Sequence, residues 1–295
     1  MKFSVVIPTY KRSDALQDTI ASIWQNFLLP DEVIVIDDDL LPNSLVQKFQ
    51  TEANNHDVAF FYYQKNHDEM RRGLSESKNW AVSLAQHEII CYLDDDVVLD
   101  KEYFSELIKV WEGNYGDEKL MGVGGCISNN RPTSNSEKIY RRIFGLAGEC
   151  DWDVNDIGFQ VWDEGVSETQ KSYYLHGGVS SYRRELLKQY PFEVFSGGRT
   201  GLEDVEHCLR SKQAGYHFYY VPTAHLTHHP APAGREAKYE SGKKEAINRK
   251  EIFKKHCNQD FKHKLRFFWA SIGWLGKKLL SGNYRGFMGM LSALI

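Results

Sequence analysis

The sequence has 295 residues, of which 42% are hydrophobic, and its formal net charge at pH 7 is -4. This length and apolar content suffice for one large α/β domain or two small ones with a sizeable core. The negative charge argues against a nucleic-acid partner, because duplex binding usually requires a concentrated excess of Lys and Arg.

Short β-branched runs alternate with helical patterns through the first hundred residues. Strands are predicted over 4–8, 32–36, 58–62 and 88–93, and helices over 43–54 and 75–86. Apolar residues also recur at helical spacing from Leu16 to Phe27, with Ser13 placed to cap that helix. This order predicts a parallel sheet with helices on both faces, which binds ligands at the carboxyl ends of its strands.

The chain becomes less regular after Ile127. A polar stretch, 128–171, is rich in Asn, Asp, Gly and Trp, and long irregular segments in a compact domain are more often functional than idle. A strand-like run follows at 173–175. Beyond it the pattern predicts a helix over 203–214, a strand over 217–221 and a charged helix over 236–256.

The last segment differs in charge from the rest. From Phe261 to Ile295 there are six Lys or Arg residues and no Asp or Glu. One stripe of a helical wheel collects the apolar residues Leu265, Phe268, Ile272, Leu275 and Leu279, which is typical of an amphipathic helix. The apolar runs are too short to span a membrane. The pattern favours a helix lying on an anionic membrane surface, with docking on the catalytic domain or on a second subunit as the alternative.

Five scattered cysteines form no C-x-x-C motif, and their odd number leaves at least one outside any disulfide scheme. The N-terminal apolar run is broken at Pro8 and is too brief for a secretory signal. We therefore expect a reducing compartment, the cytoplasm, where the chain could lie peripherally on the inner face of the membrane.

Three carboxylates, Asp94, Asp95 and Asp96, follow the predicted strand 88–93 and leave its carboxyl end together. Adjacent carboxylates raise one another's pKa unless a cation neutralises them. Hard oxygen ligands of this kind suit Mg²⁺ or Mn²⁺. A solvated acidic turn or a set of helix caps would explain the same residues.

A second acidic cluster, Asp37 to Asp39, follows the strand 32–36. A carboxylate there can accept hydrogen bonds from a nucleotide base or a ribose hydroxyl, although loop aspartates are often only turn formers. The sequence contains no G-x-G-x-x-G or G-x-x-x-x-G-K-[ST] loop, so the usual dinucleotide and P-loop sites are not predicted.

Taken in order, these motifs resemble those of family 2 glycosyltransferases with the GT-A fold. The segments that carry the resemblance are Ser4–Arg12, Val35–Asp38, Lys78–Asn79, Tyr92–Asp96 and Gly201–Glu206 with Arg210. The resemblance spans Met1 to His229. It implies a GT-A, Rossmann-like α/β fold whose mostly parallel sheet is flanked by helices, with a helical extension at the C-terminus.

The resemblance also implies a donor pocket. The residues expected to bind the nucleotide sugar are Pro8, Thr9, Tyr10, Arg12, Asp38, Lys78, Asn79, Asp94, Asp95, Gly177 and Gly178. In the glycine pair, only a bare backbone would leave room for a close ligand.

The same resemblance assigns the metal and the chemistry. Asp96 and His228 are expected to hold Mn²⁺ or Mg²⁺, with His225 competing for the histidine position. Asp204, with Glu203 beside it, resembles a general base that deprotonates the acceptor hydroxyl, so that the anomeric configuration inverts. Glu203 and Asp204 could otherwise simply place negative charge at a helix N-terminus.

We therefore expect a metal-dependent transferase that moves a single sugar from a nucleotide-diphosphate sugar, UDP-linked by family frequency, to a saccharide, lipid-linked or protein acceptor. The second strand continues as Asp38-Asp39-Leu40-Leu41-Pro42 where relatives usually have Asp-Asp-Gly-Ser, and no Gln-x-x-Arg-Trp motif of processive synthases is present. A sugar-phosphate nucleotidyltransferase and an inactive nucleotide-sugar-binding relative are the alternatives.

The expected organisation is a catalytic domain over 1–235, with a nucleotide-binding half, 1–127, and an acceptor-binding half, 128–235. The region 236–295 is expected to form the helical extension, in contact with a membrane surface or with another copy in a homo-oligomer. Trp152 and Trp162 are expected to line the acceptor wall, because aromatic faces pack on sugar rings.

Overall fold

The computed structural model describes residues 1–195, 201–231, 233 and 236–294, and its first part alternates strands with helices as predicted. These elements are β1 (Phe3–Thr9), α1 (Ser13–Ile23), β2 (Glu32–Asp37), α2 (Asn43–Asn55), β3 (Ala59–Gln64), α3 (Leu74–Leu84) and β4 (Ile89–Leu93). The first helix is shorter than expected, since it ends at Ile23 and leaves Phe27 exposed. The backbone N–H of Phe27 donates to the carbonyl oxygen of Lys101 instead.

The predicted cap of α1 is wrong. Ser13 is the first helical residue, Arg12 occupies the N-cap position, and no side chain caps this helix. The guanidinium of Arg12 instead contacts Asp95 and Asp96. Arg12 is therefore bound to carboxylates at the carboxyl edge of the sheet.

The middle of the chain contains more regular structure than its composition indicated. Its elements are β5 (Val97–Leu99), α4 (Tyr103–Gly113), β6 (Leu120–Ile127), α5 (Asn135–Ile143), β7 (Asp153–Val154), β8 (Gln160–Val161), β9 (Gln170–Ser172), β10 (Val179–Arg183), α6 (Arg184–Gln189), α7 (Glu203–Gln213) and β11 (His217–His228). The stretch expected to be irregular therefore includes a helix and a two-stranded hairpin. The strand expected at 173–175 ends at Ser172, because the N–H of Tyr173 leaves the sheet and donates to the carbonyl oxygen of Trp152.

In the described residues the main sheet has nine strands, in the order β3-β2-β1-β4-β10-β6-β11-β5, with β9 paired beside β11. The strands β3, β2, β1 and β4 run parallel to one another, and β6 runs parallel to β11. The strand β10 is antiparallel to both β4 and β6. The prediction of a mostly parallel α/β sheet is therefore confirmed.

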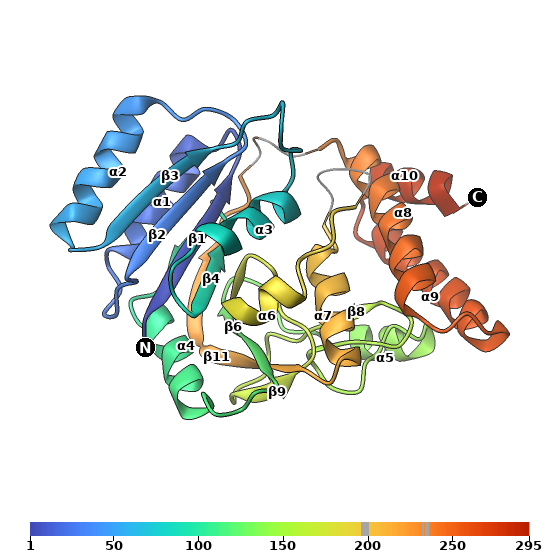
Figure 1. The fold of residues 1–295 in the computed structure, drawn as a ribbon. Helices are drawn as coiled ribbons and strands as arrows, with labels where there is room; N and C mark the ends of the chain where they lie inside the picture. Colours follow the sequence, from blue (N-terminus) through green and yellow to red (C-terminus); the bar gives the residue numbers. More distant parts are fainter. Residues whose placement is uncertain (196–200, 232, 234–235, 295) are drawn as a thin grey trace.

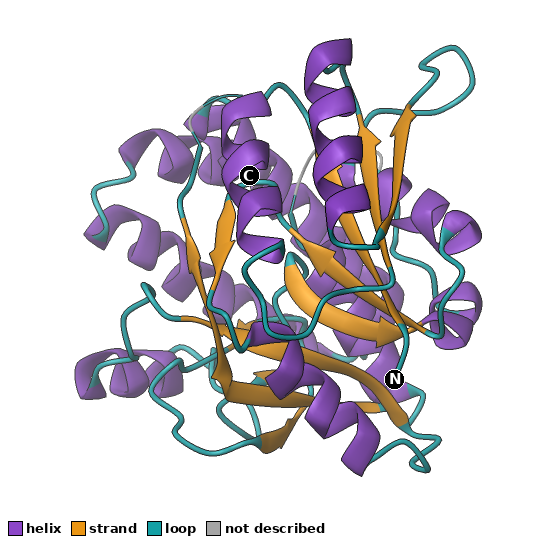
Figure 2. Cartoon of the chain, turned by 90° about the vertical axis from the view of Figure 1, so that its left-hand side faces the viewer, coloured by secondary structure: helices purple, strands orange, loops and turns teal. Residues whose placement is uncertain are grey.

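Helices cover both faces of this sheet (Figures 1 and 2). One core contains apolar residues of α1 and α4, such as Leu16 and Phe104, and the other contains residues of α3, α6 and α7, such as Val205. The strands between them are buried on both sides, as expected for parallel strands covered by crossover helices. This packing fixes the strand ends, which carry the acidic clusters, at one edge.

The predicted C-terminal extension consists of three helices, α8 (Lys238–His256), α9 (Phe261–Leu280) and α10 (Tyr284–Leu294), which lie at the side opposite β3 (Figure 1). The last of these was not predicted. The backbones of α8 and α10 approach so closely that a Cβ atom on Gly242 would collide with the backbone of Gly286, and one on Gly289 with that of Tyr239. In the described part of the chain, no helix is both long enough and apolar enough to cross a membrane.

Candidate active site

Two aspartates and a histidine meet at the carboxyl edge of the sheet. Asp94 and Asp96 follow β4, and His228 is the last residue of β11. One ligand atom from each of the three side chains can be chosen so that all lie within 4.8 Å of one another. The strand β10 between β4 and β6 supports this cluster, because the N–H of Asp94 donates to the carbonyl oxygen of Gly178 over 2.8 Å.

The pair of Asp96 and His228 is held in place. The Nε2 atom of His228 lies 3.0 Å from Oδ1 of Asp96, and Oδ2 of Asp96 accepts a hydrogen bond from the N–H of Ala231. Burial alone would raise the pKa of Asp96, but hydrogen bonds from His228 and Ala231 and the charge of Arg12 outweigh it and lower that pKa. Asp96 is therefore held as a carboxylate.

His225 does not join this cluster. Side chains alternate between the two faces of a strand, so two residues separated by three positions in β11 point to opposite faces. Within the described residues, the cluster of ligand atoms contains His228 and not His225.

Asp95 turns away from its neighbours toward β1. Its carboxylate accepts hydrogen bonds from Oγ1 of Thr9 and from Nη1 of Arg12, each over 2.8 Å. The same Arg12 nitrogen lies 3.1 Å from Oδ2 of Asp96. Burial raises the pKa of Asp95, and Arg12 and Thr9 offset part of that rise. Arg12 thus partly neutralises both aspartates.

The glycine pair packs against the site's own carboxylates. A Cβ atom on Gly178 would collide with the carboxylate of Asp94, and one on Gly177 would lie 2.8 Å from Nζ of Lys78 and 3.1 Å from Cβ of Asp204. The two glycines are thus required by the packing of protein side chains, whereas the sequence had suggested room for a ligand. Burial raises the pKa of Asp94, Lys78 lowers it, and Asp96 raises it again.

Glu203 and Asp204 open α7 and have different surroundings. Oδ2 of Asp204 accepts hydrogen bonds from the hydroxyl of Tyr174 at 3.0 Å and from the N–H of Gly177 at 3.3 Å. Glu203 is buried, and the residue before it, Leu202, has a positive φ of 89°. Strained backbone of this kind persists where surrounding structure enforces it, often at active sites.

Lys78 and Asn79 of α3 contact other parts of the protein, namely Glu203 and Phe192. Nζ of Lys78 lies 3.0 Å from Oε1 of Glu203 in a buried ion pair, and burial raises the pKa of Glu203, with Lys78 opposing the rise. The amide of Asn79 donates to the carbonyl oxygen of Phe192 and accepts from its N–H. Neither residue is among those that line the cavity described below, so their expected contact with the donor is not supported by this placement.

Asp38 faces the cavity and is held by a residue that the sequence analysis missed. Nζ of the buried Lys65 lies 2.7 Å from Oδ1 of Asp38, and the N–H of Gly73 donates to Oδ2 over 3.0 Å. Lys65 directly follows β3 at the carboxyl edge, so its position after a strand was the signal available in the sequence. Asp37 is instead a turn former, since its carboxylate accepts from the N–H groups of Asp39 and Leu41.

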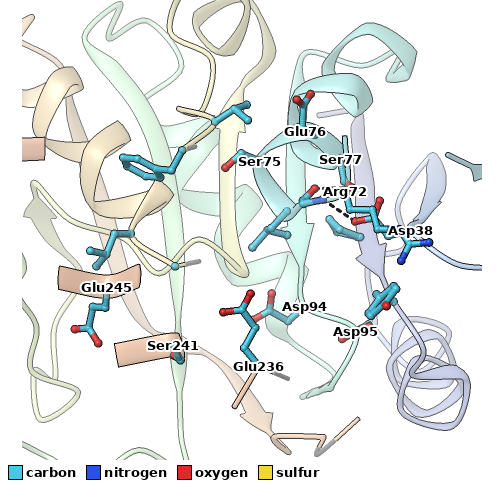
Figure 3. A pocket seen from close by; sticks show the side chains of 18 of the residues that line it. Asp38, Arg72, Ser75, Glu76, Ser77, Asp94, Asp95, Glu236, Ser241 and Glu245 are labelled. Carbon is cyan, nitrogen blue, oxygen red and sulfur yellow. Dashed lines mark hydrogen bonds between the residues drawn. The ribbon is translucent and has the colours of Figure 1, made fainter. Parts of the chain in front are cut away.

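Some of these residues, among them Asp38, Asp94 and Asp95, line a cavity of about 730 Å³ (Figure 3). On one side it is lined by residues from the sheet edge and from the start of α3, including Pro8, Thr9, Tyr10, Arg12, Asp38, Arg72, Ser75, Ser77, Asp94 and Asp95. On the other side it is lined by the C-terminal extension, including Ser241, Glu245, Lys278 and Asn283. Figure 3 shows Asp38 and Asp95 on one side of this space and Ser241 and Glu245 on the other, with Asp94 and Glu236 between them.

The expected aromatic wall is not found. Trp152 is fully buried, and its ring stacks on that of Tyr220 with centroids 4.0 Å apart. Trp162 is partly buried under Arg141, whose guanidinium lies 5.5 Å from the ring centroid. No residue of 128–171 is among those that line the cavity. Trp152 is part of the core, and Trp162 packs against it.

The sheet topology, with acidic clusters at its carboxyl edge, defines a GT-A type α/β enzyme. Residues 4–190 match the family model described as Glycosyl transferase family 2. The chain belongs to this family of glycosyltransferases.

Known proteins agree with this assignment. An uncharacterized glycosyltransferase of Mycoplasma genitalium is 32% identical over 109 residues, which cover 36% of this chain and 35% of the relative. The chain thus matches about a third of that protein's length. Among the solved structures that share the fold are the following two, which are both less than 25% identical to this chain.

The first solved structure is the mannosyltransferase PcManGT of Pyrobaculum calidifontis in complex with GDP-Man and Mn²⁺, with a TM-score of 0.57, 17% identity, and coverage of 99% of this chain and 84% of that one. The second is GalNAc-T7 with UDP, GalNAc and Mn²⁺, with a TM-score of 0.58, 15% identity, and coverage of 95% and 57%.

Proposed function

We propose that this glycosyltransferase is metal-dependent and moves a single sugar, with inversion, from a nucleotide-diphosphate sugar to an acceptor hydroxyl. The observation that carries the proposal is the meeting of Asp94, Asp96 and His228, three side chains with metal-ligand atoms, beside the cavity that Asp94 lines.

The donor set fits a divalent cation. Two carboxylates and one imidazole are ligands that suit Mn²⁺, and Mg²⁺ prefers sites richer in oxygen. Asp96 is held as a carboxylate, and His228 already approaches it, so the charges needed for a cation are present. When bound there, a cation would neutralise charge on the diphosphate leaving group. The solved GT-A structures with Mn²⁺ favour manganese.

We propose Asp204 as the general base. Its carboxylate is oriented by Tyr174 and by the N–H of Gly177, next to the glycine that packs on Asp94. The proton of the acceptor hydroxyl passes to Asp204 while the acceptor oxygen bonds to the anomeric carbon. The bond from that carbon to the phosphate oxygen breaks, and its electron pair leaves with the nucleoside diphosphate. Attack from the face opposite the phosphate inverts the anomeric configuration.

Lys78 and Glu203 are positioning residues in this proposal. Their buried ion pair lies beneath Gly177, whose backbone holds Asp204. The pair therefore fixes the start of α7, which carries the proposed base, relative to α3.

We propose Asp38 as the base-reading residue. Each carboxylate oxygen has two acceptor positions, so Asp38 can accept from a nucleobase N–H in addition to its bonds with Lys65 and Gly73. Uracil and guanine both present such an N–H, and the solved neighbours contain either UDP or GDP. We propose that the donor is a UDP-sugar. Competition between UDP and GDP for binding to the protein tests this choice.

We propose that the acceptor, a glycan or a lipid-linked saccharide, binds against the C-terminal extension. The cavity wall opposite Asp38 is formed by Ser241, Glu245, Lys278 and Asn283, whose hydroxyl, charged and amide groups can hydrogen-bond sugar hydroxyls. The sequence analysis had instead predicted that the acceptor binds to residues 128–235.

Calorimetric titration with UDP and with GDP, each with Mn²⁺ or with chelator, tests the donor and metal assignments. We expect one nucleotide to bind in the presence of Mn²⁺ and binding to weaken when the cation is removed. Binding that is equally tight with chelator would contradict the metal assignment.

The family match disfavours a sugar-phosphate nucleotidyltransferase, the first alternative. An inactive relative would bind the nucleotide sugar without hydrolysis or transfer. Product analysis of UDP-sugar incubations with and without saccharide acceptors separates that outcome from the proposed enzyme.

A further inference from the structure

Exposed apolar side chains gather on one side of the molecule. They belong to α5, to α9 and to the beginning of α10. Figure 1 shows these three helices on the right-hand side of the molecule, far from α2. The members are Ile139, Ile143, Phe261, Leu265, Phe268, Trp269, Ile272, Leu279, Leu280, Tyr284 and Met288. We call this set the α5–α9 face. Most of the large exposed apolar side chains of the described residues are found here, whereas scattered single ones are normal on a protein surface.

The helix α9 has two apolar faces. Its inner face packs on the core through Ala270 and Gly273, which are buried, and through Trp274, whose ring contacts Phe159. The regular stripe that predicted this helix, including Leu265 and Phe268, points away from the core. Phe268 is 63% exposed and Leu265 is 56% exposed. The hydrophobic effect disfavours such exposure in water, so we expect the stripe to be buried against an apolar partner.

The contacts between α5 and α9 make the face continuous. The rings of Phe144 and Trp269 stack with centroids 5.1 Å apart, and Nε1 of Trp269 donates to the carbonyl oxygen of Ile143 over 2.7 Å. The hydroxyl of Tyr140 donates to the carbonyl oxygen of Gly273 over 2.7 Å. The exposed Ile139 and Ile143 are therefore anchored beside the stripe of α9.

The charges around this face are positive. Lys262 and Lys264 at the start of α9 and Arg285 in α10 are exposed, and among the described residues no carboxylate lies within ion-pair distance of any of them. Of the acidic residues that approach α9, Glu137, Glu245 and Asp156 are paired with Lys277, Lys278 and Arg266, and the N-cap residue Asp260 is bonded to His263. The surplus of unneutralised charge at the apolar face is therefore cationic.

We propose that the α5–α9 face docks on an anionic membrane, with α9 lying in the plane of the interface. Leu265, Phe268 and Ile272 enter the boundary of the acyl chains, Trp269 lies at the headgroup level, and Lys262 and Lys264 contact lipid phosphates. A helix of this length extends about 30 Å along the surface. The proposal goes beyond the transferase activity and does not depend on it.

The charge pattern favours lipid over a second copy of the chain. In a two-fold dimer the same patch meets itself, so the cationic border of one copy would face the apolar stripe or the cationic border of the other, and neither offers an acidic partner. An anionic headgroup layer, such as the cytoplasmic leaflet provides, complements both the apolar stripe and its cationic border.

Vesicle sedimentation tests the proposal with the full chain. Vesicles of phosphatidylcholine with about a third phosphatidylglycerol are compared with pure phosphatidylcholine vesicles, at low and at high salt. We expect binding to the anionic vesicles, with at least a tenfold weaker partition onto neutral vesicles and a clear loss at high salt, because surface electrostatics are screened.

Matched variants distinguish vesicle binding through this face from nonspecific adsorption of the protein. The double variant Phe268→Ser with Ile272→Ser, and the double variant Lys262→Glu with Lys264→Glu, are expected to lose about tenfold or more of the binding. The control variants Phe27→Ser and Lys109→Glu change exposed residues outside the face, and their binding should stay at the parent level. Circular dichroism verifies that all variants fold.

Two results would overturn the proposal. One is the absence of binding to anionic vesicles by the folded parent protein. The other is a dimer in analytical ultracentrifugation that Phe268→Ser with Ile272→Ser dissociates, without any vesicle binding by the monomer. That second result would assign the face to a second copy of the chain. Nucleotide binding measured in solution remains an independent readout, so failure of the membrane proposal is distinguishable from failure of the transferase proposal.

Discussion

Oδ1 of Asp96 and Nε2 of His228 lie 3.0 Å apart although 132 positions separate the two residues in the chain. The antiparallel pairing of β5 with the end of β11 brings them together, since His228 is in register with Val97, the residue after Asp96. A metal site at this place therefore depends on the register of an edge strand.

His228→Ala should weaken Mn²⁺ binding strongly, because the cation would lose a direct ligand. Residues that only support a ligand are worth about 10- to 100-fold in metal affinity, so removal of the ligand itself should cost at least as much. The measurement is the Mn²⁺ concentration that gives half-maximal transfer. His225→Ala, on the opposite face of β11, is the control and should leave this concentration unchanged.

Asp204→Asn should lower kcat by about 10² to 10⁴, the usual contribution of a positioned acid-base group. The nucleotide should bind with parent affinity, because the proposed base contacts the acceptor hydroxyl and not the nucleotide. Tyr174→Phe, which removes a hydrogen bond to Oδ2, should give a smaller loss. Steady-state kinetics with calorimetric titration of the nucleotide provide both values. Parent turnover in Asp204→Asn would remove the base assignment.

Lys78→Met should destabilise the fold, because it leaves the buried carboxylate of Glu203 without its partner. Removing one member of a buried ion pair costs about 3 to 5 kcal/mol. Both side chains are almost fully buried, at 1% and 6% exposure, so solvent screens the pair little. Urea unfolding measures the loss. The double variant Lys78→Met with Glu203→Gln should recover part of it, and additive losses would show that the two residues are not coupled.

Gly178→Ala should disrupt the metal site through the backbone. A Cβ atom there would collide with the carboxylate of Asp94, so either that side chain or β10 must move. We expect a clear rise in the Mn²⁺ concentration required for transfer. Gly116→Ala is the matched control, since no atom lies within 4 Å of a Cβ added at that position. Equal metal requirements in the two variants would contradict the assignment of Asp94 to the site.

Ser241→Trp should narrow the cavity from the side of the extension. We expect the KM for the acceptor to rise while hydrolysis of the donor in the absence of acceptor is retained. Lys254→Ala, an exposed change elsewhere on α8, serves as the control. A loss of donor affinity in Ser241→Trp, with an unchanged KM for the acceptor, would place the acceptor elsewhere.

Much of this arrangement was accessible from the sequence, because strands and their polar ends are local patterns. Asp38 and Asp94 were found since each follows a buried strand, and the carboxyl ends of parallel strands share one edge. Alternation along β11 could also have separated His228 from His225. The proposed roles of these residues still await the experiments above.

Other features depend on contacts between distant segments, which no local pattern contains. The apolar stripe of α9 predicted a helix correctly but not which face would be buried, because Gly273 and Ala270 pack inward. Trp152 was expected in a sugar-binding wall, whereas its stacking on Tyr220 of β11 places it in the core. The lining of the cavity by the extension likewise follows only from the tertiary fold.

The helices α8 and α10 contact each other through glycines, so their backbones lie close together. Gly242 and Gly289 hold the two helices at their closest separation, and the neighbouring Ser241 and Asn283 face the cavity. A larger residue at either glycine would force the helices apart and move Ser241 and Asn283, which line the cavity. The dimensions of the cavity are therefore determined partly at positions that carry no side chain.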